Sequence, residues 1–162
     1  MARAPQTLKG KALAWVAQRE QSRVELARKL QMWVDRQARD ALASGAVAPD
    51  PAAIEPLLDW LAARDLLSDE RFAESRVNVR AARFGNLRIR QELAQHGVEL
   101  DAETAQALKR SELERARVVW SKRFAETAAD AAARAKQQRF LAARGFSAEV
   151  VRRVVGGRSD AD

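Results

Sequence analysis

Apolar residues recur at intervals of three and four along most of the chain, which is the period of one face of an α-helix. The spacing predicts helices over residues 8–18, 22–42 and 54–64, followed by further helices to about residue 155. Ser22 has the character of an N-cap residue, with Glu25 three positions later. The pattern therefore predicts a chain that is helical over most of its length.

The distribution of Pro supports this prediction. All four Pro lie at or before Pro56, so the remaining 106 residues contain none. Segment 43–53, ASGAVAPDPAA, is the only clear linker. We expect an all-α fold.

One short pattern occurs three times. A helical run is followed by Gly or Asp, a residue suited to the left-handed conformation that ends a helix, and then by an apolar residue that can fold back on that helix. The three copies are LAARDL at 61–66, LAQHGV at 93–98 and LAARGF at 141–146. They predict three tandem three-helix modules, 8–67, 68–110 and 111–155, between a frayed segment 1–7 and a disordered tail 156–162.

The charge is uneven, although the net value is +7. Residues 71–90 and 134–153 each carry a net charge of +5, whereas 44–70 holds six acids against a single Arg. This distribution favours a partner with surfaces of both signs, such as a protein bound to nucleic acid, over a uniform phosphate track.

Composition limits the chemistry. There is no Cys and only one His, so neither a thiolate site nor a His-based metal cluster can be built, and no Gly-rich phosphate loop is present. His96 and the pair Asp69-Glu70 have the character of helix-end residues. No apolar run approaches the length of a membrane span, and the N-terminus has no signal-peptide pattern. We expect a cytoplasmic, non-enzymatic protein without cofactor or metal.

Two basic patches are candidates for contact with a partner. Arg76, Arg80 and Arg83 share one helical face, and two more Arg follow the turn Phe84-Gly85-Asn86. Such Arg groups could pair with carboxylates or with phosphates, or could simply form a solvated face. Phe84 itself is expected in the core. The candidate binding residues are Arg76, Arg80, Arg83, Arg88 and Arg90 in the first patch, and Lys136, Arg139 and Arg144 in the second.

The order and spacing of these motifs over residues 11–155 resemble the RecX regulatory proteins of bacteria. The most specific matches are DERFA at 69–73, RIRQEL at 88–93 and RFLAARGF at 139–146. The chain departs from the family pattern at Phe84-Gly85-Asn86, where Tyr-Gly-Pro is usual, at Asp65, where Gly is usual, at Gln21, and in a long 31–53 segment.

The resemblance implies three tandem three-helix repeats in an elongated, curved molecule. It also implies a negative regulator that binds the RecA recombinase and its filament on DNA and suppresses ATP hydrolysis, strand exchange and filament extension. The expected partners are RecA, its nucleoprotein filament and, weakly, single- or double-stranded DNA, with the protein itself a monomer. The alternatives are a helical DNA-binding protein that acts without RecA and a scaffold whose charge serves only solubility.

Overall fold

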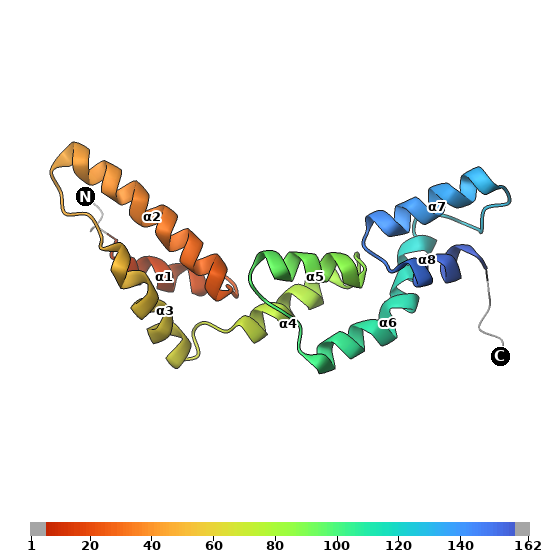
Figure 1. The fold of residues 1–162 in the computed structure, drawn as a ribbon, viewed down its shortest axis with the longest axis horizontal. Helices are drawn as coiled ribbons and strands as arrows, with labels where there is room; N and C mark the ends of the chain where they lie inside the picture. The colour runs from red at the N-terminus through yellow and green to blue at the C-terminus, as the bar shows by residue number, and fades with distance from the viewer. Residues whose placement is uncertain (1–5, 158–162) are drawn as a thin grey trace. The chain divides into compact units, whose positions relative to one another are not determined.

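The structure is a computed structural model, and it describes residues 6–157. These residues form eight α-helices and one 3₁₀ turn, with no strand among them (Figure 1). The all-helical prediction is confirmed. The elements are α1 (Leu8–Val16), α2 (Arg23–Ser44), η1 (Pro51–Ala53), α3 (Ile54–Ala63), α4 (Asp69–Arg80), α5 (Asn86–Gln95), α6 (Ala102–Ser121), α7 (Ala131–Ala143) and α8 (Ala148–Val155).

The chain divides into two compact units. The first contains the described residues up to Phe72 together with His96–Val98, and the second contains Ala73–Gln95 and the described residues from Glu99 onward. Helix α4 therefore contributes to both units. Helix α6 runs without a break across residues 110 and 111, where one expected module ends and the next begins.

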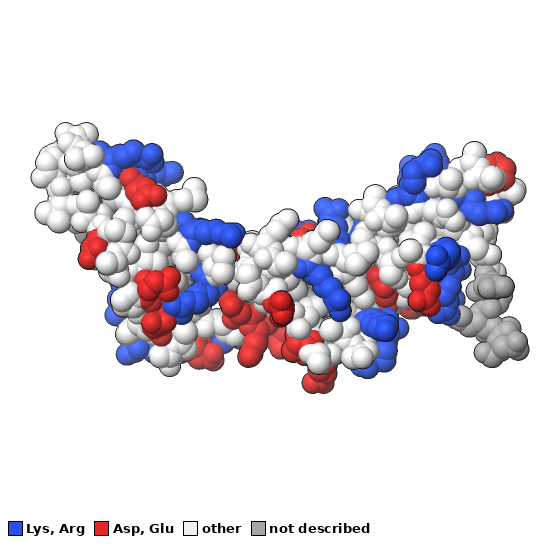
Figure 2. All heavy atoms as spheres, viewed as in Figure 1, with Lys and Arg blue, Asp and Glu red and all other residues white. Residues whose placement is uncertain are grey.

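The first unit is built on α1, α2 and α3. Its core contains fully buried Leu26, Leu30 and Leu58, and Trp15 and Trp33 pack half-buried against it. The Ser22 hydroxyl caps α2 by accepting a hydrogen bond from the Glu25 amide, as the sequence predicts. Figure 2 shows acidic side chains gathered over α3 and the beginning of α4, which belong to the acidic segment 44–70 and the residues that follow it.

The second unit has its own core where α6, α7 and α8 meet. Leu141, Phe146 and Val155 are buried there, and Phe140 packs half-buried against them. Ser147 caps α8 through the Val150 amide. The two cores have no residue in common, so each unit buries apolar surface of its own.

The three recurring corners have the predicted backbone. Asp65, Gly97 and Gly145 all adopt positive φ, at 57°, 69° and 83°. At the first corner the Leu66 amide bonds to the Leu61 carbonyl and the Asp65 amide to the Ala62 carbonyl, and the Gly145 corner repeats both bonds. These are the paired hydrogen bonds of a Schellman motif.

One detail of the first corner differs from the prediction. Val98 and Phe146 are buried after their Gly residues, but Leu66 is 40% exposed and Leu67 is buried in its place. The apolar residue that returns to the core is therefore one position later after Asp65 than after Gly97 or Gly145.

The helix ends also differ from the expected bounds. Helix α1 ends at Val16 instead of residue 18, and α2 extends to Ser44, where Gly45 ends it with φ 73°. At the N-terminal side, the Thr7 hydroxyl caps α1 through the Gly10 amide at 3.0 Å. At the other end, the Gly156 amide bonds to the Arg152 carbonyl. The rest of the expected frayed and disordered termini, residues 1–5 and 158–162, lies outside the described residues.

Candidate partner-binding surface

Phe84 lies at the centre of a group of positively charged side chains in the second unit. It lies in the turn between α4 and α5, and its side chain is buried, as expected. Four guanidinium groups face its ring. The distances from their Cζ atoms to the ring centroid are 4.4 Å for Arg88, 5.5 Å for Arg80, 5.7 Å for Arg83 and 6.0 Å for Arg144. We call these four residues the arginine cluster.

The carboxylate of Glu92 accompanies the arginine cluster. Glu92 lies 2.9 Å from Nε of Arg80 and 3.7 Å from Nε of Arg88. Arg144 donates a hydrogen bond to the Arg83 carbonyl and also stacks over Phe140 at 4.8 Å. The four Arg and Glu92 carry a net charge of +3, so the cluster keeps a strong excess of positive charge.

This arrangement suits the recognition of oxyanions. A guanidinium that lies over an aromatic ring is held by cation–π attraction, while its N–H groups stay in its own plane. Those groups can form forked hydrogen bonds to a carboxylate or a phosphate. Arg83 and Arg88 are exposed, so their donors are accessible to solvent.

The structure joins two patches that the sequence places apart. Arg144, from the second predicted patch, lies with Arg80, Arg83 and Arg88 of the first. The remaining candidates lie outside the cluster: Arg76 is half-buried on α4, Arg90 is exposed on α5, and Lys136 and Arg139 are exposed on α7.

Two Gly residues bring α5 and the α7 corner together. The Gly85 amide donates to the Arg144 carbonyl at 2.8 Å, and the Leu87 amide donates to the Gly145 carbonyl at 3.0 Å. A Cβ atom on Gly85 would lie 2.2 Å from the Phe146 backbone nitrogen, and one on Gly145 would lie 2.5 Å from the Cβ of Arg88. Only residues without side chains allow this approach, which places Arg144 beside Phe84.

A buried carboxylate also connects the start of α5 with the residue that follows the α7 corner. Glu112 of α6 is 5% exposed and accepts hydrogen bonds from the Asn86 amide at 3.1 Å and the Ser147 amide at 3.2 Å. Its second oxygen accepts from the Ser147 hydroxyl at 3.1 Å. One negative group therefore serves the N-terminal ends of both α5 and α8, where helix dipoles favour negative charge.

Arg115 lies one turn after Glu112 on α6, and it binds the turn between α4 and α5. It donates to the carbonyls of Ala81 and Phe84 at 3.0 and 2.9 Å and also bonds to the side chain of Asn86. Burial lowers the pKa of the Arg115 guanidinium, and the charge of Glu112 acts in the opposite direction. Arg115 is thus a structural residue that positions Phe84.

The spacing of residues along α6 places Glu112 on the buried face of that helix. The buried face of α6 runs through Leu108, Glu112, Ala116 and Val119, at spacings of four, four and three. A charged residue at a core position of a helix needs partners, because an unpaired buried charge is costly.

The first residues of α4 make structural contacts within the first unit. Asp69 begins α4, as predicted, and its carboxylate also accepts a hydrogen bond from the Arg23 amide at 2.8 Å. Arg71 pairs with Glu20 and Asp65, which raise the pKa of its guanidinium. His96 packs against Phe72 with ring centroids 5.2 Å apart. These contacts account for the polar residues of this segment without invoking a catalytic site.

The structure and site define a class of protein: an all-helical chain of three-helix modules that presents arginine side chains. Two family models match, the third RecX three-helix domain over residues 111–155 and the second over 68–108. In the described residues, no helix combines the length and apolarity that crossing a bilayer requires.

Relatives match over nearly the whole chain. The regulatory protein RecX of Leptothrix cholodnii is 48% identical over 151 residues, which cover 92% of this chain and 87% of that protein. RecX of Ralstonia nicotianae is 45% identical, covering 96% and 90%. The crystal structure of RecX from Lactobacillus salivarius has the same fold, with a TM-score of 0.66, 21% identity and 92% coverage of both chains. The chain belongs to the RecX family, a non-enzymatic family of regulatory proteins.

Proposed function

We propose that the protein is a negative regulator of the RecA recombinase, which binds the RecA–DNA filament and inhibits its ATP hydrolysis, strand exchange and extension. Membership of the RecX family carries the proposal. The arginine cluster supports it, because its exposed donors fit carboxylates on a protein as well as phosphates on DNA.

The proposed contact surface extends from the arginine cluster to the other basic candidates. Arg76 and Arg90 would extend it along α4 and α5, and Lys136 and Arg139 along α7. The protein would act as a monomer and would bind free DNA weakly, so that RecA provides most of the affinity. The arginine cluster would meet RecA carboxylates or DNA phosphates.

The test is ATP hydrolysis by RecA on single-stranded DNA. We expect stoichiometric protein to suppress hydrolysis, and the double variant Arg83→Glu/Arg88→Glu to lose at least about tenfold in inhibitory potency, because both side chains are exposed and their charge is reversed. The control is Lys109→Glu/Arg110→Glu, which makes the same change of charge on exposed residues of α6. An absence of inhibition by the unaltered protein would refute the proposal.

The alternative is a helical DNA-binding protein that acts without RecA. The net charge of +7 and the helix corners favour it. It predicts tight binding to duplex DNA alone, with affinity falling steeply as salt rises in proportion to the phosphates contacted. Fluorescence anisotropy with labelled duplex, measured over a range of salt concentrations, separates the two functions.

A further inference from the structure

A groove between α1 and α2 in the first unit combines aromatic and cationic side chains. It has a volume of about 180 Å³. Its lining contains two Trp, one Met and three cations, and no acidic residue: Lys11 and Trp15 from α1, and Lys29, Met32, Trp33 and Arg36 from α2. The four residues of α2 follow one another at spacings of three, one and three, so they form one face of the helix.

The apolar side chains in this groove are incompletely covered. Trp15 and Trp33 are half-buried against the core, and Met32 is 69% exposed. An unbranched Met beside two indoles makes a floor that can adapt to an incoming apolar side chain. A volume of about 180 Å³ is enough for one bulky apolar side chain.

The cations are held over the aromatic floor. The ammonium nitrogen of Lys11 lies 4.8 Å from the ring centroid of Trp15, and that of Lys29 lies 5.9 Å from it. Lys11 and Arg36 have no carboxylate partner among the described residues. Both are therefore available to a negatively charged guest.

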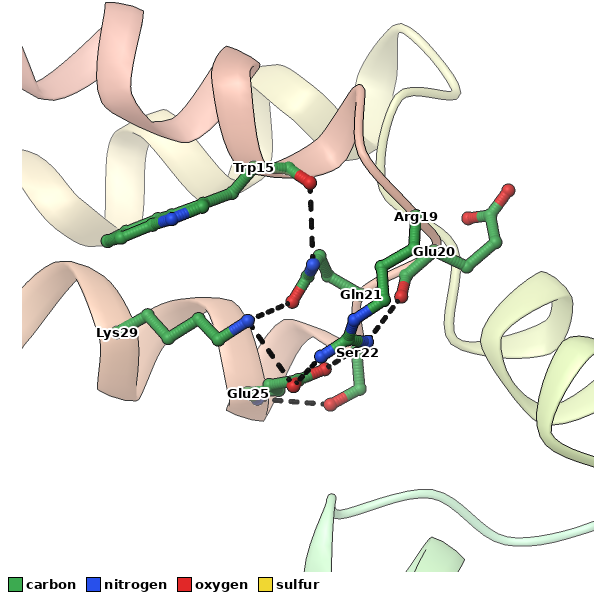
Figure 3. Close-up of polar contacts among 7 residues, drawn as sticks. All are labelled: Trp15, Arg19, Glu20, Gln21, Ser22, Glu25 and Lys29. Atoms are coloured by element: carbon green, nitrogen blue, oxygen red, sulfur yellow. Dashed lines mark hydrogen bonds and ion pairs between the residues drawn. The ribbon is translucent and has the colours of Figure 1, made fainter.

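The ammonium of Lys29 is held at one side of the groove by two polar partners, Gln21 and Glu25. Gln21 is 2% exposed; its amide donates to the Trp15 carbonyl and its oxygen accepts from the Lys29 ammonium at 2.9 Å (Figure 3). Glu25 lies 3.4 Å from the same ammonium and also pairs with Arg19. Burial acts to raise the pKa of Glu25, but Arg19 and Lys29 outweigh it and hold that pKa below its ordinary value.

We propose that this groove binds an acidic peptide segment that carries one bulky apolar side chain. The apolar side chain would enter between Trp15, Met32 and Trp33, and flanking carboxylates would meet Lys11 and Arg36. The inference goes beyond the proposed function and does not rest on it, because it concerns a different unit and a different set of residues.

The observations favour a peptide over single-stranded nucleic acid. Base stacking needs an open aromatic face, but two ammonium groups lie over Trp15. A nucleic acid also needs a positive track along its backbone, whereas residues 44–70 of the same unit hold six acids and one Arg. A short acidic segment needs only the local positive charge of the groove.

The test titrates the full chain with a synthetic peptide in which a central Phe is flanked on both sides by Glu. Calorimetry measures affinity, and the indole N–H resonances of Trp15 and Trp33 report the site. Trp120, whose indole bonds to Gln137 in the second unit, is the internal reference. We expect the Trp15 and Trp33 signals to shift while the Trp120 signal stays, and affinity to fall as salt rises.

Charge-reversal variants distinguish peptide binding in the groove from a general effect of the protein's charge. Lys11→Glu/Arg36→Glu should weaken peptide binding at least about tenfold, whereas Arg39→Glu, an exposed change outside the groove, should leave it nearly unchanged. Met32→Asp and a peptide with Ala in place of Phe should weaken binding too. The exposure of Met32 means that its replacement leaves the fold intact.

Three results would overturn the proposal: no binding of the Phe peptide, equal binding by the Lys11→Glu/Arg36→Glu protein, or equal binding of the Ala peptide. An oligothymidylate that shifts the same two indole signals when the peptide does not would assign the groove to single-stranded nucleic acid instead. Failure of RecA inhibition would leave this test unaffected, because peptide binding is measured without RecA.

Discussion

At the scale of the residue, Glu112 is a buried side chain that connects distant parts of the second unit. It satisfies the amides of Asn86 and Ser147 at the starts of two helices that are far apart in sequence. Those amides have few other partners, because the first N–H groups of a helix lack intrahelical acceptors. Loss of the carboxylate would leave buried donors unpaired.

We expect Glu112→Ala to lower the free energy of unfolding by about 1–3 kcal/mol, which is the cost of leaving buried polar groups unsatisfied. Glu114→Ala is the matched control on the same helix. The Glu114 side chain is exposed and only pairs with Arg117, so its loss should cost less than about 0.5 kcal/mol. Urea denaturation followed by circular dichroism measures both, and equal effects would show that Glu112 has no special role.

At the scale of the element, the α7 corner both ends a helix and contacts the start of α5. The Gly145 carbonyl accepts from the start of α5, and the same residue leaves room for Arg88. The corner at Gly97 repeats the arrangement in the first unit, where an added Cβ would lie 2.5 Å from the Val24 side chain of α2. In both places, the corner after one helix receives the beginning of another.

Gly145→Ala and Gly45→Ala form a matched pair, because both residues have positive φ. Nothing lies within 4 Å of a Cβ on Gly45. The Gly45→Ala variant should therefore lose only about 1–2 kcal/mol of unfolding free energy, which is the cost of a left-handed backbone conformation for a residue with a Cβ. Gly145→Ala should lose about 1–3 kcal/mol more, since the new methyl meets Arg88. Thermal unfolding of the two variants provides the comparison, and similar losses would contradict the close packing at Gly145.

At the scale of the whole molecule, the two separate cores imply two regions of stability. Leu58 belongs to the first core and Leu141 to the second, and both are fully buried. The arginine cluster lies in the second unit, and the cationic groove lies in the first. The chain thus carries two chemically different candidate surfaces, one in each unit.

We expect Leu58→Ala and Leu141→Ala each to lower stability by about 2–5 kcal/mol, the range for a Leu cavity. Hydrogen exchange read by mass spectrometry should rise in α1–α3 for Leu58→Ala and in α6–α8 for Leu141→Ala, because local opening follows the core that was weakened. An equal rise in both regions for either variant would mean that the cores unfold as one.

Local chemistry accounts for the parts of the fold that could be predicted. The Ser22 cap and the turns at Asp65 and Gly145 depend on residues within one or two helical turns of each other. The arginine candidates were also found from local spacing along α4 and α5. The prediction that Leu66 folds back on its helix was wrong. Leu66 and Leu67 are adjacent and both apolar, so the sequence pattern cannot tell which of them is buried.

The sequence by itself determined the helices, their caps, the three left-handed corners and the uneven charge, because each arises from interactions between residues close in the chain. Only the tertiary structure placed Arg144 beside Phe84, since that neighbourhood depends on two Gly residues meeting from segments 60 positions apart. It also decided that Glu112 is buried and that Lys11 lies over Trp15. Contacts of this kind depend on how helices pack, and helical periodicity carries no information about which helices will meet.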